Sequence, residues 1–309
     1  MRKPITVYKG GRGLYTREDP VRLEFDGENG VNGLAYAVNV VCSDTGRISR
    51  RGGYTKVSTD VYHSIFPYDS TRFLGINGSS LRLVSVLDFS YTNIATVTEG
   101  AKGSYARVGA MVLFVNGYET GIIENGAWSD WVVGTPSGRY ASKKYYGPPA
   151  GTLVTYYANS VFIAEDNVLW YSEAPSINLF RKASGYLYYG SNINMVCPVA
   201  TGLYLSTENR VRYLGGKTAE TLAENILTDY PAIRGTDVLI SGLVVGGNLR
   251  NPEPVCVFTT TEGICVGGSD KVFGSILFDN LTRERFDYPS GSEGAATVID
   301  NVYVVNIYK

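Results

Sequence analysis

The chain contains a single histidine, His63, in the segment DVYHSIF. Ser-His-Asp and Cys-His mechanisms both need a histidine base, so either would have to use this residue. No other histidine or cysteine lies near it at the spacing of a zinc site. A lone histidine in a β-rich run is more often an ordinary structural side chain. The sequence therefore predicts no nucleophilic triad, no bound metal and no cofactor.

A glycine-rich stretch, Gly215-Gly216-Lys217-Thr218, resembles the end of a phosphate-binding loop. Such a loop needs a further glycine five positions before its second glycine, and Val211 stands there instead. A parallel strand–helix–strand context is also missing, which argues against nucleotide binding.

Acidic side chains offer a different chemistry, because a glycosidase needs two carboxylates about 5–10 Å apart. The candidates are Glu124, Asp130, Glu165, Asp166 and Glu173. Glu165 and Asp166 fall in a predicted turn, where aspartate commonly bonds the backbone. Carboxylates scattered over surface loops are common in proteins that are not glycosidases. A glycosidase on a propeller scaffold is therefore the least favoured hypothesis, and we expect that the chain is not an enzyme.

Aromatic and basic residues are the remaining candidates for ligand or interface contacts. Trp128, Trp131 and Trp170 could serve as platforms for sugars, as could tyrosine clusters that include Tyr156-Tyr157. The alternative for these rings is packing between sheets. Arg47, Arg50 and Arg51 form the densest basic group and could contact DNA phosphates or an acidic partner. A charged, solvated hairpin edge explains them equally well.

Bulk composition narrows the class of protein. The formal net charge of -1 argues against a dedicated nucleic-acid binder, which needs excess Lys and Arg. No apolar run approaches the roughly 20 residues of a membrane helix. The N-terminus is basic but lacks the apolar stretch of a signal peptide. Four separated cysteines indicate buried free thiols, with a Cys256–Cys265 bridge as the minor alternative.

Hairpins recur along the chain, each formed by two β-rich runs around a polar turn. Their spacing averages about 43 residues, close to the period of a four-stranded propeller blade. Gly (36 residues) and Tyr (24 residues) suit such turns and strands. The seven turns centre on Asp44, Asn77, Asn116, Asp166, Asn209, Gly263 and Asn301.

These repeats predict an all-β fold, a β-propeller of about six or seven irregular blades. We expect residues 1–32 to form an extended arm and residues 33–309 a single propeller domain. A short helical insertion is predicted near 217–230, where Leu222, Ile226 and Leu227 share a helical face. A pair of β-sandwiches is the main structural alternative. The last hairpin lacks outer strands, which must come from the N-terminal arm or from a neighbouring subunit.

Two stretches carry a resemblance to a known group. The segment NVVCSDTGRISRRGGYTKV, residues 39–57, and a region within 149–215 containing SVFIAEDNVLWYS and GLYLSTENRVRYLG, resemble tail structural proteins of tailed bacteriophages. The resemblance implies a propeller similar to the tail hub or nozzle of short-tailed phages. Those proteins form rings, usually of six copies, around the DNA exit channel. They contact adaptor and portal proteins and carry fibres or spikes.

The resemblance thus implies a virion protein of the tail, made in the host cytoplasm, assembling as a homo-oligomer and allowing non-specific passage of DNA. The chain is shorter than those proteins, which leaves a tail-tip, fibre-docking or receptor-facing position open. The resemblance assigns no functional residue to this chain. A carbohydrate-binding or receptor-binding propeller is the alternative from another functional class.

Overall fold

A computed structural model describes residues 40–42, 48–50, 52–53, 55–245, 252–261, 263–271, 273–275, 288–289, 291–299 and 302–308. Within these ranges the fold is all-β, and strands connect in simple antiparallel meanders. None of the helices described is long and apolar enough to cross a membrane. The proposed arm at 1–32 lies outside the described residues.

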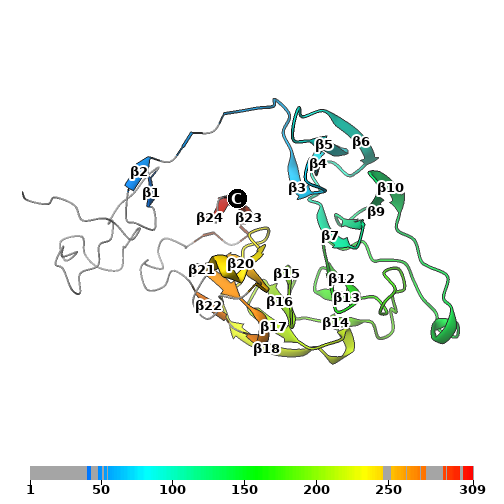
Figure 1. Ribbon diagram of the computed structural model, residues 1–309. Helices are drawn as coiled ribbons and strands as arrows, with labels where there is room; N and C mark the ends of the chain where they lie inside the picture. Colours follow the sequence, from blue (N-terminus) through cyan, green and yellow to red (C-terminus); the bar gives the residue numbers. More distant parts are fainter. Residues whose placement is uncertain are drawn as a thin grey trace, which may run out of the picture.

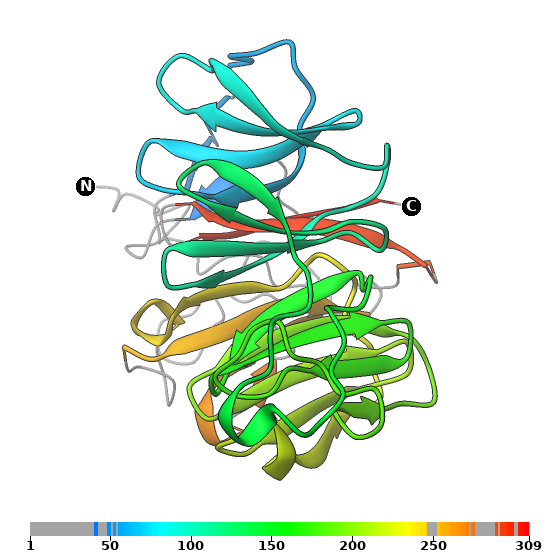
Figure 2. The same cartoon turned by 90° about the vertical axis from the view of Figure 1, so that its right-hand side faces the viewer.

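Five sheets of four antiparallel strands follow one another along the chain and form a β-propeller. Figure 1 shows them in chain order around an arc, and Figure 2 shows the same blades from the side. Their strands are β3 His63–Pro67, β4 Arg72–Asn77, β5 Ser80–Ser85 and β6 Tyr91–Thr96 in blade one; β7 Ser104–Val108, β8 Met111–Val115, β9 Thr120–Glu124 and β10 Ala127–Asp130 in blade two; β11 Leu153–Tyr157, β12 Ser160–Glu165, β13 Val168–Tyr171 and β14 Tyr186–Tyr188 in blade three; β15 Ile193–Val199, β16 Gly202–Thr207, β17 Val211–Gly215 and β18 Ala223–Thr228 in blade four; and β19 Val238–Ser241, β20 Pro254–Thr260, β21 Gly263–Gly267 and β22 Phe273–Ser275 in blade five.

Two further hairpins stand apart from the four-stranded blades. Strand β1, Val40–Cys42, pairs with β2, Ile48–Arg50, and β23, Glu293–Ile299, pairs with β24, Val302–Tyr308. The described helices are single turns: η2 Gly138–Tyr140, η3 Ala219–Thr221, α1 Gly242–Val245 and η5 Ser269–Lys271. Where six or seven blades were expected, the described residues form five complete blades and two isolated hairpins.

The hydrophobic core is divided among the blade interfaces. Alternate residues of a strand point to opposite faces of its sheet, so each of blades two to five supplies two clusters, whereas blade one supplies one. In β12, Phe162 and Ala164 pack toward blade four, whereas Val161 and Ile163 pack toward blade two. The interface of blades three and four contains eleven buried residues. At the other extreme, three buried valines of blade five meet Tyr303 of β24.

The predicted helix near 217–230 is wrong. Only η3 is helical there, and β18 pairs with β17 as the fourth strand of blade four. Leu222 packs on the core toward blade three and Leu227 on the core toward blade five, while Ile226 is 56% exposed. Leu222 and Leu227 are an odd number of positions apart and pack on opposite faces of the blade, as alternating side chains of a strand do. Residues 223–228 form a strand because pairing with the edge of β17 satisfies the backbone hydrogen-bonding groups of both segments.

Candidate functional site

The turns of the propeller fall on two faces of the ring. Because each blade is an antiparallel meander, its first-to-second and third-to-fourth turns lie on one face. The second-to-third turns lie on the opposite face. Five of the predicted hairpin turns, from Asn77 to Gly263, are of this second-to-third type.

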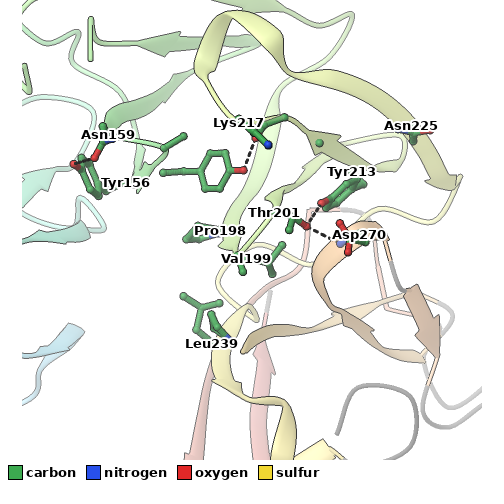
Figure 3. Close-up of a pocket in the computed structure, with 16 residues that line it drawn as sticks. Tyr156, Asn159, Pro198, Val199, Thr201, Tyr213, Lys217, Asn225, Leu239 and Asp270 are labelled. Carbon is green, nitrogen blue, oxygen red and sulfur yellow. Dashed lines mark hydrogen bonds between the residues drawn. The ribbon is translucent and has the colours of Figure 1, made fainter. Parts of the chain in front are cut away.

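A pocket of about 970 Å³ opens on the face of the first-to-second turns, where blades three, four and five meet. Figure 3 shows Tyr156 and Asn159 on one side, Lys217 and Tyr213 from blade four, and Leu239 and Asp270 from blade five. Its lining also includes Tyr157, Ala158, Pro198, Val199, Ala200, Thr201, Gly215, Gly216, Asn225 and Pro254.

Hydrogen bonds fix the tyrosines beneath this pocket. The buried Tyr157 hydroxyl donates to the carbonyl oxygen of Gly216, and burial raises the pKa of Tyr157. The Tyr213 hydroxyl lies 2.7 Å from Thr201 Oγ1, which accepts the backbone N–H of Asp270 at 2.6 Å. Loops from three blades are therefore joined into one preorganised wall.

Glycines allow the Tyr213 ring to lie against the backbone. A Cβ at Gly202 would stand 2.7 Å from Tyr213 Cζ, and one at Gly215 would stand 2.8 Å from Tyr213 Cε1. Both distances are too short for a real contact, so larger residues would displace the ring. The sequence GGKT thus serves close packing and exposes Lys217 at the rim.

The rim of the pocket is polar. Ala158 and Asn159 form the tight β11–β12 turn, with φ values of 49° and 62° that match a type I′ hairpin. Asn159, Lys217 and Asp270 are exposed. An amide and two charges of opposite sign thus line the rim, while the Tyr156 ring packs on the core shared with blade two and lies away from Lys217 and Asp270. The apolar side chains of Pro198 and Leu239 beside these polar groups suit a polar ligand that has one apolar face.

The predicted tryptophan platforms are largely packed into the blades. Trp131 is 3% exposed and packs edge-on against Phe180. Trp128 packs on Phe114 and covers Gly121. Trp170 contacts Tyr186, and its Nε1 donates to Glu165 at 2.9 Å. The structure does not bring the three rings into the pocket.

The other predicted contact residues are also scattered. Arg50 is exposed on β2, while Arg47 and Arg51 lie outside the described residues. Among the acids, Glu173 forms an ion pair with Arg181, and Asp166 occupies the β12–β13 turn with φ of 51°. Glu124 and Asp130 belong to the outer strands of blade two.

His63 has a local structural environment. Its Nδ1 lies 3.0 Å from the Ser64 hydroxyl, and that hydroxyl accepts the backbone N–H of Gly103. Burial is the main cause that lowers the pKa of His63. Cys197, Cys256 and Cys265 are buried and free, which confirms the thiol prediction for these three. In the part of the chain that the structure describes, no three His, Cys, Asp or Glu side chains gather as a metal site.

Sequence reasoning identified parts of the pocket without joining them. Tyr156-Tyr157 stood out as a possible stacking pair, and residues 215–218 as a possible loop motif. Asp270 and Asn159 carried no signal beyond turn chemistry. Their proximity to one pocket depends on how three blades pack, which is not encoded in a local spacing.

No protein-family model matches the chain, and no curated protein matches it. Solved structures with a similar arrangement include the extracellular domain of a putative hybrid two-component system from B. thetaiotaomicron, at 11% identity and TM-score 0.46, covering 76% of this chain and 30% of that one. The WD40 domain of Neurospora crassa Pan2 matches at 8% identity and TM-score 0.44, covering 67% and 61%. An auxiliary nutrient binding protein from Bacteroides thetaiotaomicron matches at 6% identity and TM-score 0.42, covering 70% and 56%. The chain spans less than two thirds of the length of each. The propeller assignment rests on the chain's own strand order.

Proposed function

We propose that this chain is a non-catalytic structural component of a bacteriophage tail, working as one subunit of a ring of identical copies. The observation that carries the proposal is the strand pattern within residues 149–215, which resembles tail structural proteins. This region forms β11 to β17, the central frame of blades three and four. The resemblance therefore falls on residues that build the propeller of each subunit.

The charge of the chain supports a role beside DNA that passes through. A protein that neutralises many phosphates releases counterions and binds DNA tightly. With 28 Lys and Arg against 29 Asp and Glu, this chain has no excess positive charge to hold the duplex. A hub or nozzle subunit that surrounds or caps an exit channel benefits from such weak attraction. Its exposed loops and sheet edges would contact adaptor, portal, fibre or spike proteins.

Proteomics of purified virions tests this proposal. We expect peptides of this chain in particles from a phage that carries its gene, at a fixed ratio to the major capsid protein. A nonsense mutation in the gene should leave filled capsids with incomplete tails, and expression of the intact chain in trans should restore infectivity. Particles that lack the chain yet infect normally would contradict a virion role.

The pocket favours a second candidate function, carbohydrate binding. Pro198 and Leu239 can face the apolar side of a sugar ring, while Asn159, Lys217 and Asp270 can bond its hydroxyl groups. This site replaces the tryptophan platforms that the sequence suggested. A tail protein that docks on a host surface could use it.

An array of bacterial surface oligosaccharides tests the second candidate. We expect Lys217→Ala to weaken binding of a positive oligosaccharide by about tenfold, because a hydrogen bond to a charged group is lost. Lys143→Ala is the matched control: Lys143 is also exposed, in the loop between β10 and β11, and does not line the pocket. No binding across the array, or equal losses in the two variants, would eliminate carbohydrate recognition at this pocket.

A further inference from the structure

The two hairpins outside the four-stranded blades have complementary places in the chain order. In blades one to four, the fourth, outer strand leads to the first, inner strand of the next blade, as β6 leads to β7 and β14 leads to β15. Strand β2 leads in the same way to β3, the first strand of blade one. By this rule, β2 is a fourth strand and β1 is a third strand.

The C-terminal hairpin supplies the first half of a blade. A parallel bridge joins Glu293 of β23 to Arg234, just before the inner strand β19, and the Gly294 N–H donates to the Arg234 carbonyl at 2.8 Å. Inner strands of successive propeller blades run parallel around the axis, whereas a second strand would run antiparallel to them. Strand β23 is therefore the inner strand of a sixth unit, and β24 is its second strand.

The outer edge of β24 is available for another strand. Within the described residues, β24 pairs only with β23, and no described strand pairs with its other edge. The described side chains of β24 are half-buried or exposed, whereas those of β16 and β12 are almost entirely buried. An open edge of seven residues is a template for a further strand.

We propose that the β1–β2 hairpin of the same chain adds to the outer edge of β24, with β1 as third strand and β2 as fourth, and completes a split sixth blade. Figure 1 shows both hairpins at the opening of the arc, on the side away from blades two and three. Residues 51–62 connect β2 to β3 and span up to about 40 Å when extended, which permits this docking. The occupant is thus identified by chain order and reach.

The split blade also accounts for the seven hairpins of the sequence. Five are the second-to-third hairpins of complete blades, and the remaining two are the halves of one blade. It places Arg50 on the outermost strand of the ring, where a charged residue protects an edge from further pairing.

Thiol cross-linking tests the docking directly. Because Cys197, Cys256 and Cys265 are buried, the thiols under test are Cys42 of β1 and a cysteine introduced in β24. A short bis-maleimide added to the folded Asn306→Cys variant should link residue 306 to Cys42. We expect this linked peptide pair within single molecules, independent of protein concentration. Asn209→Cys, an exposed position in the β16–β17 turn, is the control and should give no link to Cys42.

Hydrogen exchange gives a readout that needs no cross-linker geometry. Val41→Pro removes a backbone donor from β1 and should speed amide exchange in β24 by about tenfold, while β12 and β16 keep their rates. Cross-links between molecules would show that a second copy takes the edge and would overturn the intramolecular blade. An absent link, or unchanged exchange of β24 in Val41→Pro, would overturn it as well.

Discussion

Strand β16 of blade four and strand β24 of the C-terminal hairpin are both second strands beside an inner strand, yet their surroundings differ. All six residues of β16 are buried, whereas Tyr303 to Tyr308 of β24 are half-buried or exposed. Strand β16 has partners at both edges and a cluster on each face. Strand β24 has one described partner and packs on one small cluster.

The difference shows that burial in this fold comes from neighbours rather than from strand sequence. Both strands are apolar, GLYLST and VYVVNIY. In blade four the apolar residues pack into the interfaces with blades three and five. At β23–β24, polar contacts contribute much of the attachment: Tyr303 bonds Thr236 and Thr259, and Lys102 bonds Glu293 and Tyr308. The strength of these two attachments can be compared by mutation.

The largest expected change in the free energy of unfolding comes from comparing a core truncation in β16 with one in β24. Leu205 of β16 is fully buried, so Leu205→Ala should lower the free energy of unfolding by about 2–5 kcal/mol through lost burial and a cavity. Its matched partner, Val305→Ala in half-buried β24, should cost less than about 1 kcal/mol. Urea unfolding followed by tryptophan fluorescence measures both. Equal costs would show that β24 is as deeply buried in solution as β16.

The second effect concerns Asp237, just before β19 beside the C-terminal hairpin. Burial raises the pKa of Asp237 from 3.8 to about 6, so the folded state holds its proton more tightly than the unfolded state. Stability contributed by this group therefore falls as pH rises from about 4 to 6. Asp237→Asn should raise the free energy of unfolding by about 1–3 kcal/mol at pH 7 and have little effect at pH 4. Urea unfolding at the two pH values measures this; a pH-independent difference would refute the ionisation argument.

The third effect tests the polar attachment of β24. The Tyr303 hydroxyl donates to the Thr236 carbonyl and lies 3.1 Å from Thr259 Oγ1. Tyr303→Phe keeps the ring and should cost about 1–2 kcal/mol, because buried groups lose a partner. Tyr188→Phe, at a site 69% exposed, is the control and should be near neutral. Differential scanning calorimetry of the pair decides whether the hydroxyl stabilises the hairpin.

The sequence predicted the features of this fold that depend on local chemistry. Turns at Asn77-Gly78 and Asp166 use residues that adopt positive φ, and the structure places φ at 58° for Gly78 and 51° for Asp166. The continuous apolar run in SVFIAE predicted a strand, and β12 forms there. Such features require only neighbouring residues, so they can be recognised without knowing the tertiary fold.

Features that depend on neighbouring blades were not predictable in the same way. Leu222, Ile226 and Leu227 fit both a helix and a strand, and the open edge of β17 selects the strand. Trp131 could be a platform or a core residue, and contact with Phe180 decides for the core. Asp270 reaches the pocket only because blade five packs against blade four. Long-range packing supplies the information that local patterns lack.

The smallest effect tests how the C-terminal hairpin is joined to the start of the propeller. Lys102, in the connection between β6 and β7, bonds Glu293 and Tyr308, and its side chain is 39% exposed. Solvent screens such a pair, so Lys102→Met should cost less than about 1 kcal/mol of global stability. Because the contact holds the end of a weakly buried hairpin, the same change should speed amide exchange in β23 and β24 without affecting β16.

Lys143→Met, at an exposed site on the loop between β10 and β11, is the control. High salt should remove the difference between Lys102→Met and the unmodified chain. Unchanged exchange in β23 and β24 at low salt would mean that this polar contact does not hold the hairpin, leaving the packing of Tyr303 on blade five as its main attachment.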